Sequence, residues 1–277
     1  MFSKLVPVPS GAVIPERDIN KRPILNCINL GITFGGLKAV DDFNLMIGRT
    51  EIAGLIGPNG AGKTTVFNLL TKVYQPTHGT ILLDGQDTHN MTTAQVNRAG
   101  IARTFQNIRL FNNLTVEENV TVAMDAQMNY SMVSGIFRLP SFWKEEKVAH
   151  ERALELLSLF HMEELADVKA GSLPYGAQRR LEIVRALATN PSLLLLDEPA
   201  AGMNPSETAE LMENIRKIRD TFQIAVLLIE HDMNLVMNIC EGICVLNFGR
   251  VIAKGSPAEI QSNPVVIEAY LGKQKEA

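Results

Sequence analysis

EIAGLIGPNGAGKTT, residues 51–65, is the stretch of this 277-residue sequence from which the fold can be inferred. Its first part, EIAGLIG, is a short and nearly continuous apolar run, which is typical of a strand buried on both faces. A glycine-rich turn ends this run, and KTTVFNLLTKVY then has apolar residues at helical spacing. The pattern predicts a buried strand, a tight loop and a helix in that order.

The loop GPNGAGKTT, residues 57–65, fits the phosphate-binding pattern G-x-x-x-x-G-K-[ST]. Its glycines let the chain bend so that backbone N–H groups point inward, and the start of the following helix adds a dipole that favours an anion. In this pattern Lys63 contacts the β- and γ-phosphates, and the hydroxyl of Thr64 is a ligand of Mg²⁺. A glycine-rich turn can arise by chance, but the flanking strand and helix are the context that the motif requires. The sequence therefore predicts a nucleotide site.

Two acidic residues end a second apolar run, LLLLDEP, at residues 193–199. Asp197 is a candidate anchor for Mg²⁺ through a water molecule, and Glu198 is placed to polarise a water that attacks the γ-phosphate. Adjacent acids at strand ends are also common on surfaces, and the upstream loop makes that alternative the weaker one. His231 in LLIEHD and Gln106 in ARTFQN carry no specific signal alone, and they gain weight only as part of a set.

The composition argues against several classes of function. The net charge is −4 and the 26 basic residues are spread along the chain, whereas a nucleic-acid partner would favour a concentrated basic face. No apolar run reaches the roughly 18 residues of a membrane span, and the N-terminus lacks the apolar core of a signal peptide. We therefore expect a soluble chain whose connection to any membrane comes through a partner.

The three cysteines, Cys27, Cys240 and Cys244, do not form a disulfide framework, which indicates a reducing compartment. The Cys240/Cys244 pair could suggest a metal site. Because no second pair of ligands follows, we interpret both as buried small hydrophobic residues.

The rest of the chain extends an α/β pattern outward from the loop. Residues 1–23, with four prolines, predict a flexible tail, and ILNCINLGITF with VDDFNLMIG predicts paired strands. A helical subdomain is expected at about 107–172, with Leu154, Leu157 and Phe160 on one helix face. The runs SLLLLDE and QIAVLLIEH flank the helical ETAELMENIRKIRDTF, an order that predicts a parallel sheet with crossover helices. GICVLNFGRVIAKG then predicts a hairpin.

In this order the motifs resemble those of the nucleotide-binding subunit of ATP-binding cassette (ABC) transporters, over residues 24–277. Phe34 in ITFGGLKAV matches the aromatic residue that stacks on adenine, and LPYGAQ, residues 173–178, matches the signature motif. AAGMNP, residues 200–205, matches the dimer-facing loop, and His231 matches the switch histidine. The resemblance implies a P-loop NTPase with a RecA-like parallel sheet, an antiparallel β subdomain and the inserted helical subdomain.

A narrower similarity is carried by RTFQNIRLFNNLTVEENVTVA, SGIFRLPSFWKEE, LDEPAAGMNP, LLIEHDMNLVM and NPVVIEAYLG. These segments are similar to the LivG type of ATPase subunit, which serves bacterial importers of branched-chain amino acids. The longer helical insert favours this type over the LivF-type sister subunit. The similarity implies ATP and Mg²⁺ as cofactors and a peripheral place on the cytoplasmic face of the inner membrane. It also implies three partners: membrane permease subunits, a second ATP-binding subunit (in a homodimer or with a LivF-type partner), and a periplasmic or extracellular binding protein that acts indirectly, through the permease. No nucleic acid is expected as a partner.

In the family, two subunits sandwich two ATP molecules, and each phosphate-binding loop faces the signature motif of the other subunit. The resemblance therefore implies catalytic roles for Glu198, His231, Gln106 and Lys63, and Mg²⁺ ligation by Thr64, Gln106 and Asp197. Tyr175, Gly176 and Ala177 would contact the partner's nucleotide. In its own site the chain would bind ATP through Phe34, Gly57, Pro58, Asn59, Gly60, Ala61, Gly62, Lys63, Thr64 and Thr65.

The signature departs from the family pattern at Pro174, where a serine is usual, and at Ala177. The missing hydroxyl would have donated a hydrogen bond to the γ-phosphate across the dimer. Proline is well tolerated in the first turn of a helix, and Gly176 and the helix dipole remain. We expect a weakened composite site with unimpaired ATP binding at the chain's own loop, or a heterodimer in which only one of two sites is weakened.

Three rival functions remain open at this point. One is the ATPase of another transport system, such as lipid or lipopolysaccharide export, or the uptake of amides, urea or aromatic acids. Another is a non-transport ATP-driven clamp on ribosomes or DNA, although such relatives usually carry two cassettes in one chain. The third is a regulatory subunit with negligible hydrolysis, which Glu198 and His231 disfavour.

Overall fold

The computed structural model describes residues 23–124 and 140–271. The predicted tail therefore lies outside the described residues except for Pro23, and so does most of the SGIFRLPSFW segment.

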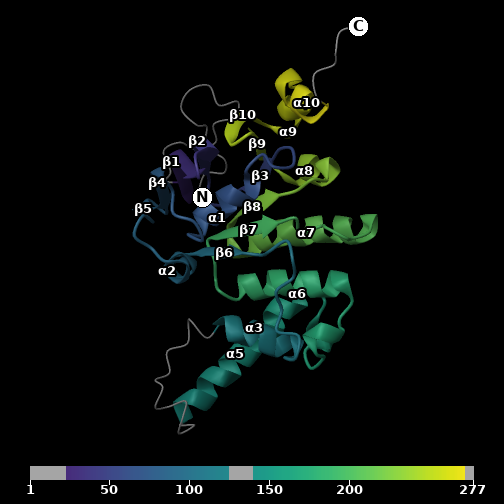
Figure 1. Cartoon of the computed structure of the whole chain (residues 1–277). Helices are drawn as coiled ribbons and strands as arrows, with labels where there is room; N and C mark the ends of the chain where they lie inside the picture. The colour runs from purple at the N-terminus through teal and green to yellow at the C-terminus, as the bar shows by residue number, and fades with distance from the viewer. Residues whose placement is uncertain (1–22, 125–139, 272–277) are drawn as a thin grey trace.

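The central sheet carries the phosphate-binding loop, and in the described residues it has the strand order β10-β9-β3-β8-β7-β6 (Figure 1). Pairing is parallel from β9 through β6, and β10 joins antiparallel to β9 as the predicted hairpin. All residues of β3, β7 and β8 are buried, because a parallel sheet is covered on both faces. The strands are β3 (Ile52–Ile56), β6 (Ile101–Arg103), β7 (Leu193–Asp197), β8 (Ala225–Ile229), β9 (Gly242–Asn247) and β10 (Arg250–Gly255).

A second, antiparallel sheet has the order β2-β1-β4-β5 and forms the predicted β subdomain. Its first two strands run antiparallel from Leu25 opposite Ile47 to Phe34 opposite Leu37. The strands are β1 (Leu25–Phe34), β2 (Leu37–Ile47), β4 (His78–Leu83) and β5 (Gln86–Asp87).

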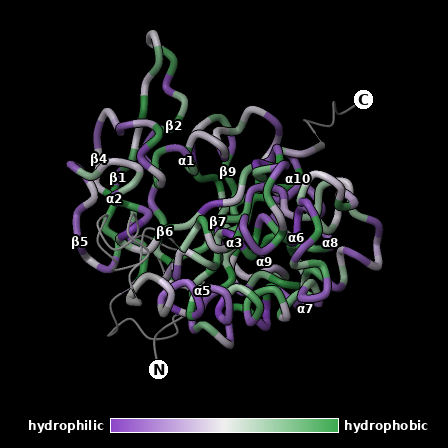
Figure 2. The backbone as a smooth tube through the Cα atoms, turned by 90° about the horizontal axis from the view of Figure 1, so that it is seen from below, coloured by the Kyte–Doolittle hydropathy of each residue, from purple (hydrophilic) through white to green (hydrophobic). Residues whose placement is uncertain are grey.

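The central sheet separates two hydrophobic cores. Along β7, Leu194 and Leu196 belong to a core shared with the helices, whereas Leu193 and Leu195 belong to one shared with the antiparallel sheet and α1. This alternation follows from the two-residue period of a strand. Figure 2 shows that the outer helices, such as α5, carry both hydrophilic and hydrophobic stretches along the chain. The sheet thus forms the middle layer, and its carboxyl edge holds the candidate site.

Local sequence signals set the helix limits. At the start of α7, the side chain of Asn204 accepts hydrogen bonds from the backbone N–H groups of Ser206 and Glu207. In return, the carboxylate of Glu207 accepts a hydrogen bond from the N–H of Asn204. Pro205 is the first residue of the helix. The helices are α1 (Lys63–Leu70), α2 (Thr93–Arg98), α3 (Val116–Met124), α5 (Pro140–Ser158), α6 (Tyr175–Leu187), α7 (Pro205–Phe222), α8 (Met233–Ile239), α9 (Pro257–Gln261) and α10 (Pro264–Leu271), with 3₁₀ turns η2 (Glu163–Leu165) and η3 (Ala170–Ser172).

Within the predicted helical subdomain, α3 and α5 lie together below α6 (Figure 1). The expected helical face was wrong for Phe160, because α5 ends at Ser158. The chain continues in a tighter turn, in which the N–H of Phe160 donates to the carbonyl of Leu157, and His161 has a left-handed φ of 53°. Phe160 is nevertheless fully buried, so the apolar signal was correct and the helical period was not.

Candidate nucleotide site

The phosphate-binding loop joins the end of β3 to the start of α1, as predicted. Gly57 and Gly62 both have positive φ, at 153° and 104°. A Cβ atom at Gly57 would lie 2.0 Å from the carbonyl oxygen of Leu246, and one at Gly62 would lie 2.8 Å from that of Ala39. Only glycine fits between these neighbouring backbones, so the two glycines fix the loop in its bent shape.

Lys63, the first residue of α1, folds back over this loop. Its Nζ donates to the carbonyl oxygens of Gly57 at 2.7 Å and Pro58 at 3.1 Å. Burial lowers the pKa of the Lys63 ammonium, while Glu198 and Asp197 act in the opposite direction. An anion entering the loop would supply a counter-charge for this poorly solvated cation.

An open cleft of about 710 Å³ brings together most of the predicted residues. The cleft is large enough for the triphosphate group of a nucleotide. Its wall is formed by the phosphate-binding loop together with Gln106, Glu198 and His231, which come from separate elements. Phe34 lies outside this lining, at the end of β1, half-exposed and edge-on to Tyr74 with 5.2 Å between ring centroids. The lining residues are Asn59, Gly60, Ala61, Gly62, Lys63, Thr64, Thr65, Gln106, Glu198 and His231.

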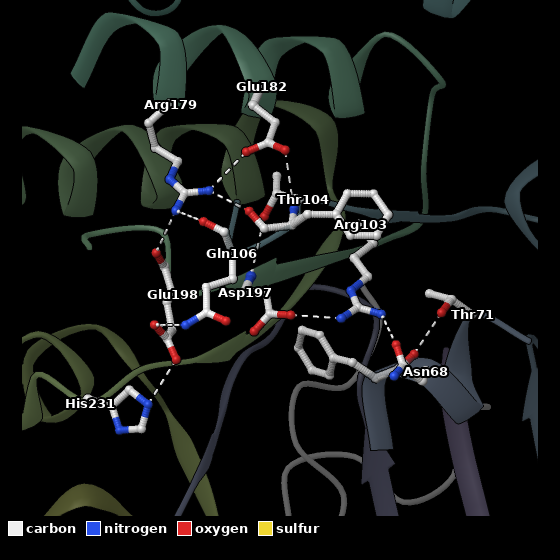
Figure 3. Close-up of polar contacts among 12 residues, drawn as sticks. Asn68, Thr71, Arg103, Thr104, Gln106, Arg179, Glu182, Asp197, Glu198 and His231 are labelled. Atoms are coloured by element: carbon white, nitrogen blue, oxygen red, sulfur yellow. Dashed lines mark hydrogen bonds and ion pairs between the residues drawn. The ribbon is translucent and has the colours of Figure 1, made fainter. Parts of the chain in front are cut away.

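Glu198 lies at the centre of a hydrogen-bonded group of three side chains (Figure 3). Its Oε2 accepts from Nε2 of Gln106 at 2.9 Å, and its Oε1 lies 2.9 Å from Nε2 of His231. Glu198 adopts a left-handed φ of 50°, and its N–H donates to the carbonyl of Ile229. Such a conformation costs a non-glycine residue about 1–3 kcal/mol and is common at functional sites. The structure thus holds this carboxylate in one orientation at the cleft.

Asp197 is buried and paired with Arg103, a contact that sequence reasoning did not predict. Nη2 of Arg103 donates to Oδ2 of Asp197 at 2.7 Å, and its Nη1 donates to Oδ1 of Asn68 on α1 at 2.7 Å. The predicted Mg²⁺ ligands, Thr64, Gln106 and Asp197, each have a side-chain oxygen, the kind of donor atom that Mg²⁺ prefers. Among the described residues, there is no cluster of three or more histidine, cysteine or acidic side chains that could hold a metal.

The signature residues lie at the start of α6 and do not line this chain's own cleft. Tyr175 is exposed and lies against Gly202, whereas the side chain of Ala177 is buried in the core, so Ala177 could reach a nucleotide only through its backbone. Pro174 is the N-cap of α6, one residue before the first turn in which we expected it. Its φ of −56° and ψ of 153° put it outside the helix, because helical geometry begins at Tyr175.

Four further charged residues contact the site, and none of them was predicted from the sequence. Arg103 follows two apolar residues in β6, an unusual place for a charge that could have signalled its role. Arg179 and Glu182 are one helical turn apart, a spacing typical of surface pairs, yet both are buried. Glu230 accepts from the N–H groups of Ala200 and His231, and burial raises its pKa.

Residues 40–201, more than half of the chain, match the family model described as "ABC transporter". The chain belongs to the ABC transporter family, whose ATP-binding cassettes bind nucleotide at a loop of this kind. Residues 250–276 match a further model, described as "Branched-chain amino acid ATP-binding cassette transporter". None of the helices that the structure describes combines the length and the apolarity needed to cross a membrane.

Relatives with curated descriptions extend over nearly the whole chain. It is 48% identical to the high-affinity branched-chain amino acid transport ATP-binding protein BraF of Pseudomonas aeruginosa, and 49% identical to LivG, of the same description, from Escherichia coli K12. Each alignment covers 91% of this chain and 99% of the relative. The lipopolysaccharide export ATP-binding protein LptB of Haemophilus influenzae is 32% identical over 91% of this chain and 98% of its own length.

Solved structures confirm the fold. A nucleotide-free ATP-binding cassette from an ABC transporter matches with a TM-score of 0.78 and 30% identity, over 91% of this chain and all of the other. A cassette in its ADP conformation matches with the same TM-score and 31% identity, over 91% of this chain and 99% of the other. The predicted α/β class and its P-loop NTPase architecture are therefore correct.

Proposed function

We propose that this chain is the ATP-hydrolysing subunit of an importer for branched-chain amino acids. The observation that carries the proposal is the position of Glu198, held by Gln106 and His231 at the cleft of the phosphate-binding loop. Identities of 48% and 49% to the BraF and LivG proteins support the transport system and its substrate class. The match of residues 250–276 to the branched-chain amino acid model supports the same assignment.

The residues divide into three roles in hydrolysis. Lys63 and backbone N–H groups of the loop after Pro58 bind the β- and γ-phosphates. Thr64, Gln106 and Asp197 hold Mg²⁺, which neutralises phosphate charge when bound. Glu198 polarises the attacking water, while Gln106 and His231 fix the direction of its carboxylate oxygens. Phe34 stacks on the adenine.

The site is completed by a second ATP-binding subunit. Tyr175 and Gly176 lie outside the chain's own cleft, so their place at a nucleotide requires the partner's loop to face them. A dimeric cassette bound to ADP and phosphate is similar to this chain, with a TM-score of 0.71 and 26% identity over 84% of it. The partner is a second copy or a LivF-type subunit, and both dock on permease subunits at the cytoplasmic face of the membrane. We assign residues 24–277 to the cassette of this assembly and residues of about 107–172 to its helical subdomain.

The experiment is ATP-driven uptake of labelled leucine into vesicles that contain the permease subunits, both ATPase subunits and the binding protein. Wild-type chain should support uptake, and Glu198→Gln should bind ATP but support neither hydrolysis nor uptake. Uptake of urea or an aromatic amino acid in place of leucine would keep the ATPase role and overturn the substrate class. Equal leucine uptake with the Glu198→Gln chain would overturn the proposed role of this subunit.

A further inference from the structure

Helix α6, which begins within the signature motif, also contains a completely buried ion pair. Nη1 of Arg179 lies 2.9 Å from Oε2 of Glu182, and the two side chains are 0% and 2% exposed. A buried charge is costly unless its remaining hydrogen-bonding groups find partners. The other contacts of this pair therefore indicate what it does.

The remaining hydrogen bonds of Arg179 go to the two segments that carry Gln106 and Glu198 (Figure 3). Its Nη1 donates to the carbonyl oxygen of Phe105 at 2.5 Å, and its Nη2 donates to that of Gln106 at 2.8 Å. Nη2 also lies 3.3 Å from the carbonyl oxygen of Glu198. One guanidinium thus contacts the backbone of the segment between β6 and α3 and the backbone just after β7. Gln106 and Glu198, which lie in these two segments, are 92 residues apart in the sequence.

Glu182 contacts the same loop from the other side of the pair. Its Oε1 accepts from the N–H of Phe105 at 3.3 Å, while its Oε2 holds Arg179. Phe105 is therefore bound through both its N–H and its carbonyl group. The partners that satisfy this buried pair therefore lie outside α6, in the two segments that carry Gln106 and Glu198.

We propose that Arg179 is a positioning residue that fixes Gln106 and Glu198 relative to the first turn of α6. This inference rests on the proposed function, in which Gln106 and Glu198 act on the chain's own nucleotide and the start of α6 faces the partner's. Residues 175 and 179 are one helical turn apart, so a shift of the signature turn moves the guanidinium and the backbone that it holds. The arrangement links the two nucleotide sites of the dimer through one side chain.

The test compares the full chain with three variants. Arg179→Lys keeps the charge opposite Glu182 but lacks the planar fork that reaches several carbonyls. The double variant Arg179→Gln/Glu182→Gln removes both charges and leaves neither one buried alone. Arg216→Gln, on the surface of α7 beside Glu213, is the matched control for losing one arginine. For each chain, ATP affinity, kcat in permease-containing vesicles, melting temperature and amide hydrogen exchange are measured.

The double variant should lose about 10- to 100-fold in kcat, the loss expected when catalytic groups shift by about 1 Å. Its ATP affinity should stay within about three-fold of wild type, since Lys63 and the loop are unchanged. Arg179→Lys should be intermediate, and Arg216→Gln should equal wild type. Exchange should rise in peptides covering residues 104–107 and 198–201, and not in the phosphate-binding loop.

A double variant with wild-type kcat, or with unchanged exchange at residues 104–107, would overturn the proposal. Parallel losses of ATP affinity and melting temperature would also overturn it, because they indicate a merely structural ion pair. Failure of the proposed function is a separate result, in which the wild-type chain itself hydrolyses no ATP. In that event the exchange measurement alone still decides whether Arg179 holds the two segments.

Discussion

Replacing Pro174 by serine should repair two deficits at the start of α6. Pro174 is exposed, and its φ of −56° and ψ of 153° are values that serine adopts without strain. The N-cap currently provides no side-chain hydrogen bond. A serine there would accept from a backbone N–H of the first turn, which typically stabilises a protein by about 0.5–2 kcal/mol. Its hydroxyl would also donate to the γ-phosphate held by the partner's loop.

The catalytic gain can be estimated from that second contact. A hydrogen bond to a charged group contributes about 1.5–3 kcal/mol, which corresponds to roughly a 10- to 150-fold increase in rate if it forms only in the transition state. Partial formation with bound ATP would reduce the gain. We therefore expect a rise in kcat of about ten-fold, at the lower end of this range, with ATP affinity at the chain's own loop unchanged.

Two control variants separate the contributions of helix capping and catalysis. Pro174→Ala removes the proline without adding a hydroxyl and sets the baseline for both measurements. Pro174→Asp caps the helix as serine does, but its carboxylate cannot donate to phosphate and repels it. Melting temperature should rise in the serine and aspartate variants, while steady-state ATPase activity should rise only with serine. Equal ATPase rates for serine and alanine would refute the reasoning.

Three other perturbations follow from individual contacts. Arg103→Met leaves the Asp197 carboxylate buried without its partner, so it should lower the free energy of unfolding, measured in urea, by about 3–5 kcal/mol. Adding Asp197→Asn should recover most of this loss. A loss below about 1 kcal/mol in Arg103→Met would contradict the reasoning. Gly57→Ala forces a Cβ against a backbone carbonyl at 2.0 Å and should abolish ATP binding in a fluorescence titration, unlike Gly35→Ala, where the space is open. The hydrogen bond of His150 with Glu117 raises the pKa of the histidine above 6.5. The stability that this pair contributes is therefore present below pH 6.5 and is lost as the pH rises through the raised pKa. In an NMR titration the His150 pKa should be lower in Glu117→Gln than in the wild type, and an unchanged pKa would exclude the pairing.

The parts of the fold that depend on the local spacing of apolar residues and glycines could be predicted from the sequence. A buried strand, a glycine loop and a helix at residues 51–70 lie where the apolar run, the glycines and the helical spacing indicate. Strands β7 and β8 are parallel, as expected for two neighbouring strands that a helix, α7, connects. Cys240 and Cys244 are buried, as expected for small hydrophobic residues.

Contacts between distant segments could not be predicted in the same way. Arg103 meets Asp197 across 94 residues, and Arg179 meets Phe105 across 74, only because β6, β7 and α6 pack side by side. Arginine is rarely buried in proteins, and where it is, the burial depends on partners that the local sequence does not reveal. The end of α5 was also missed, because the apolar pattern continues to Phe160 whereas the helix ends at Ser158.

The most direct test of the account is ATP hydrolysis by the chain assembled with its permease subunits, compared with Glu198→Gln in the same assembly. The site geometry predicts steady hydrolysis by the wild-type chain, and it predicts that the glutamine variant binds ATP with similar affinity but does not turn it over. Hydrolysis by the glutamine variant at the wild-type rate would contradict the central claim that Glu198, held by Gln106 and His231, activates the attacking water.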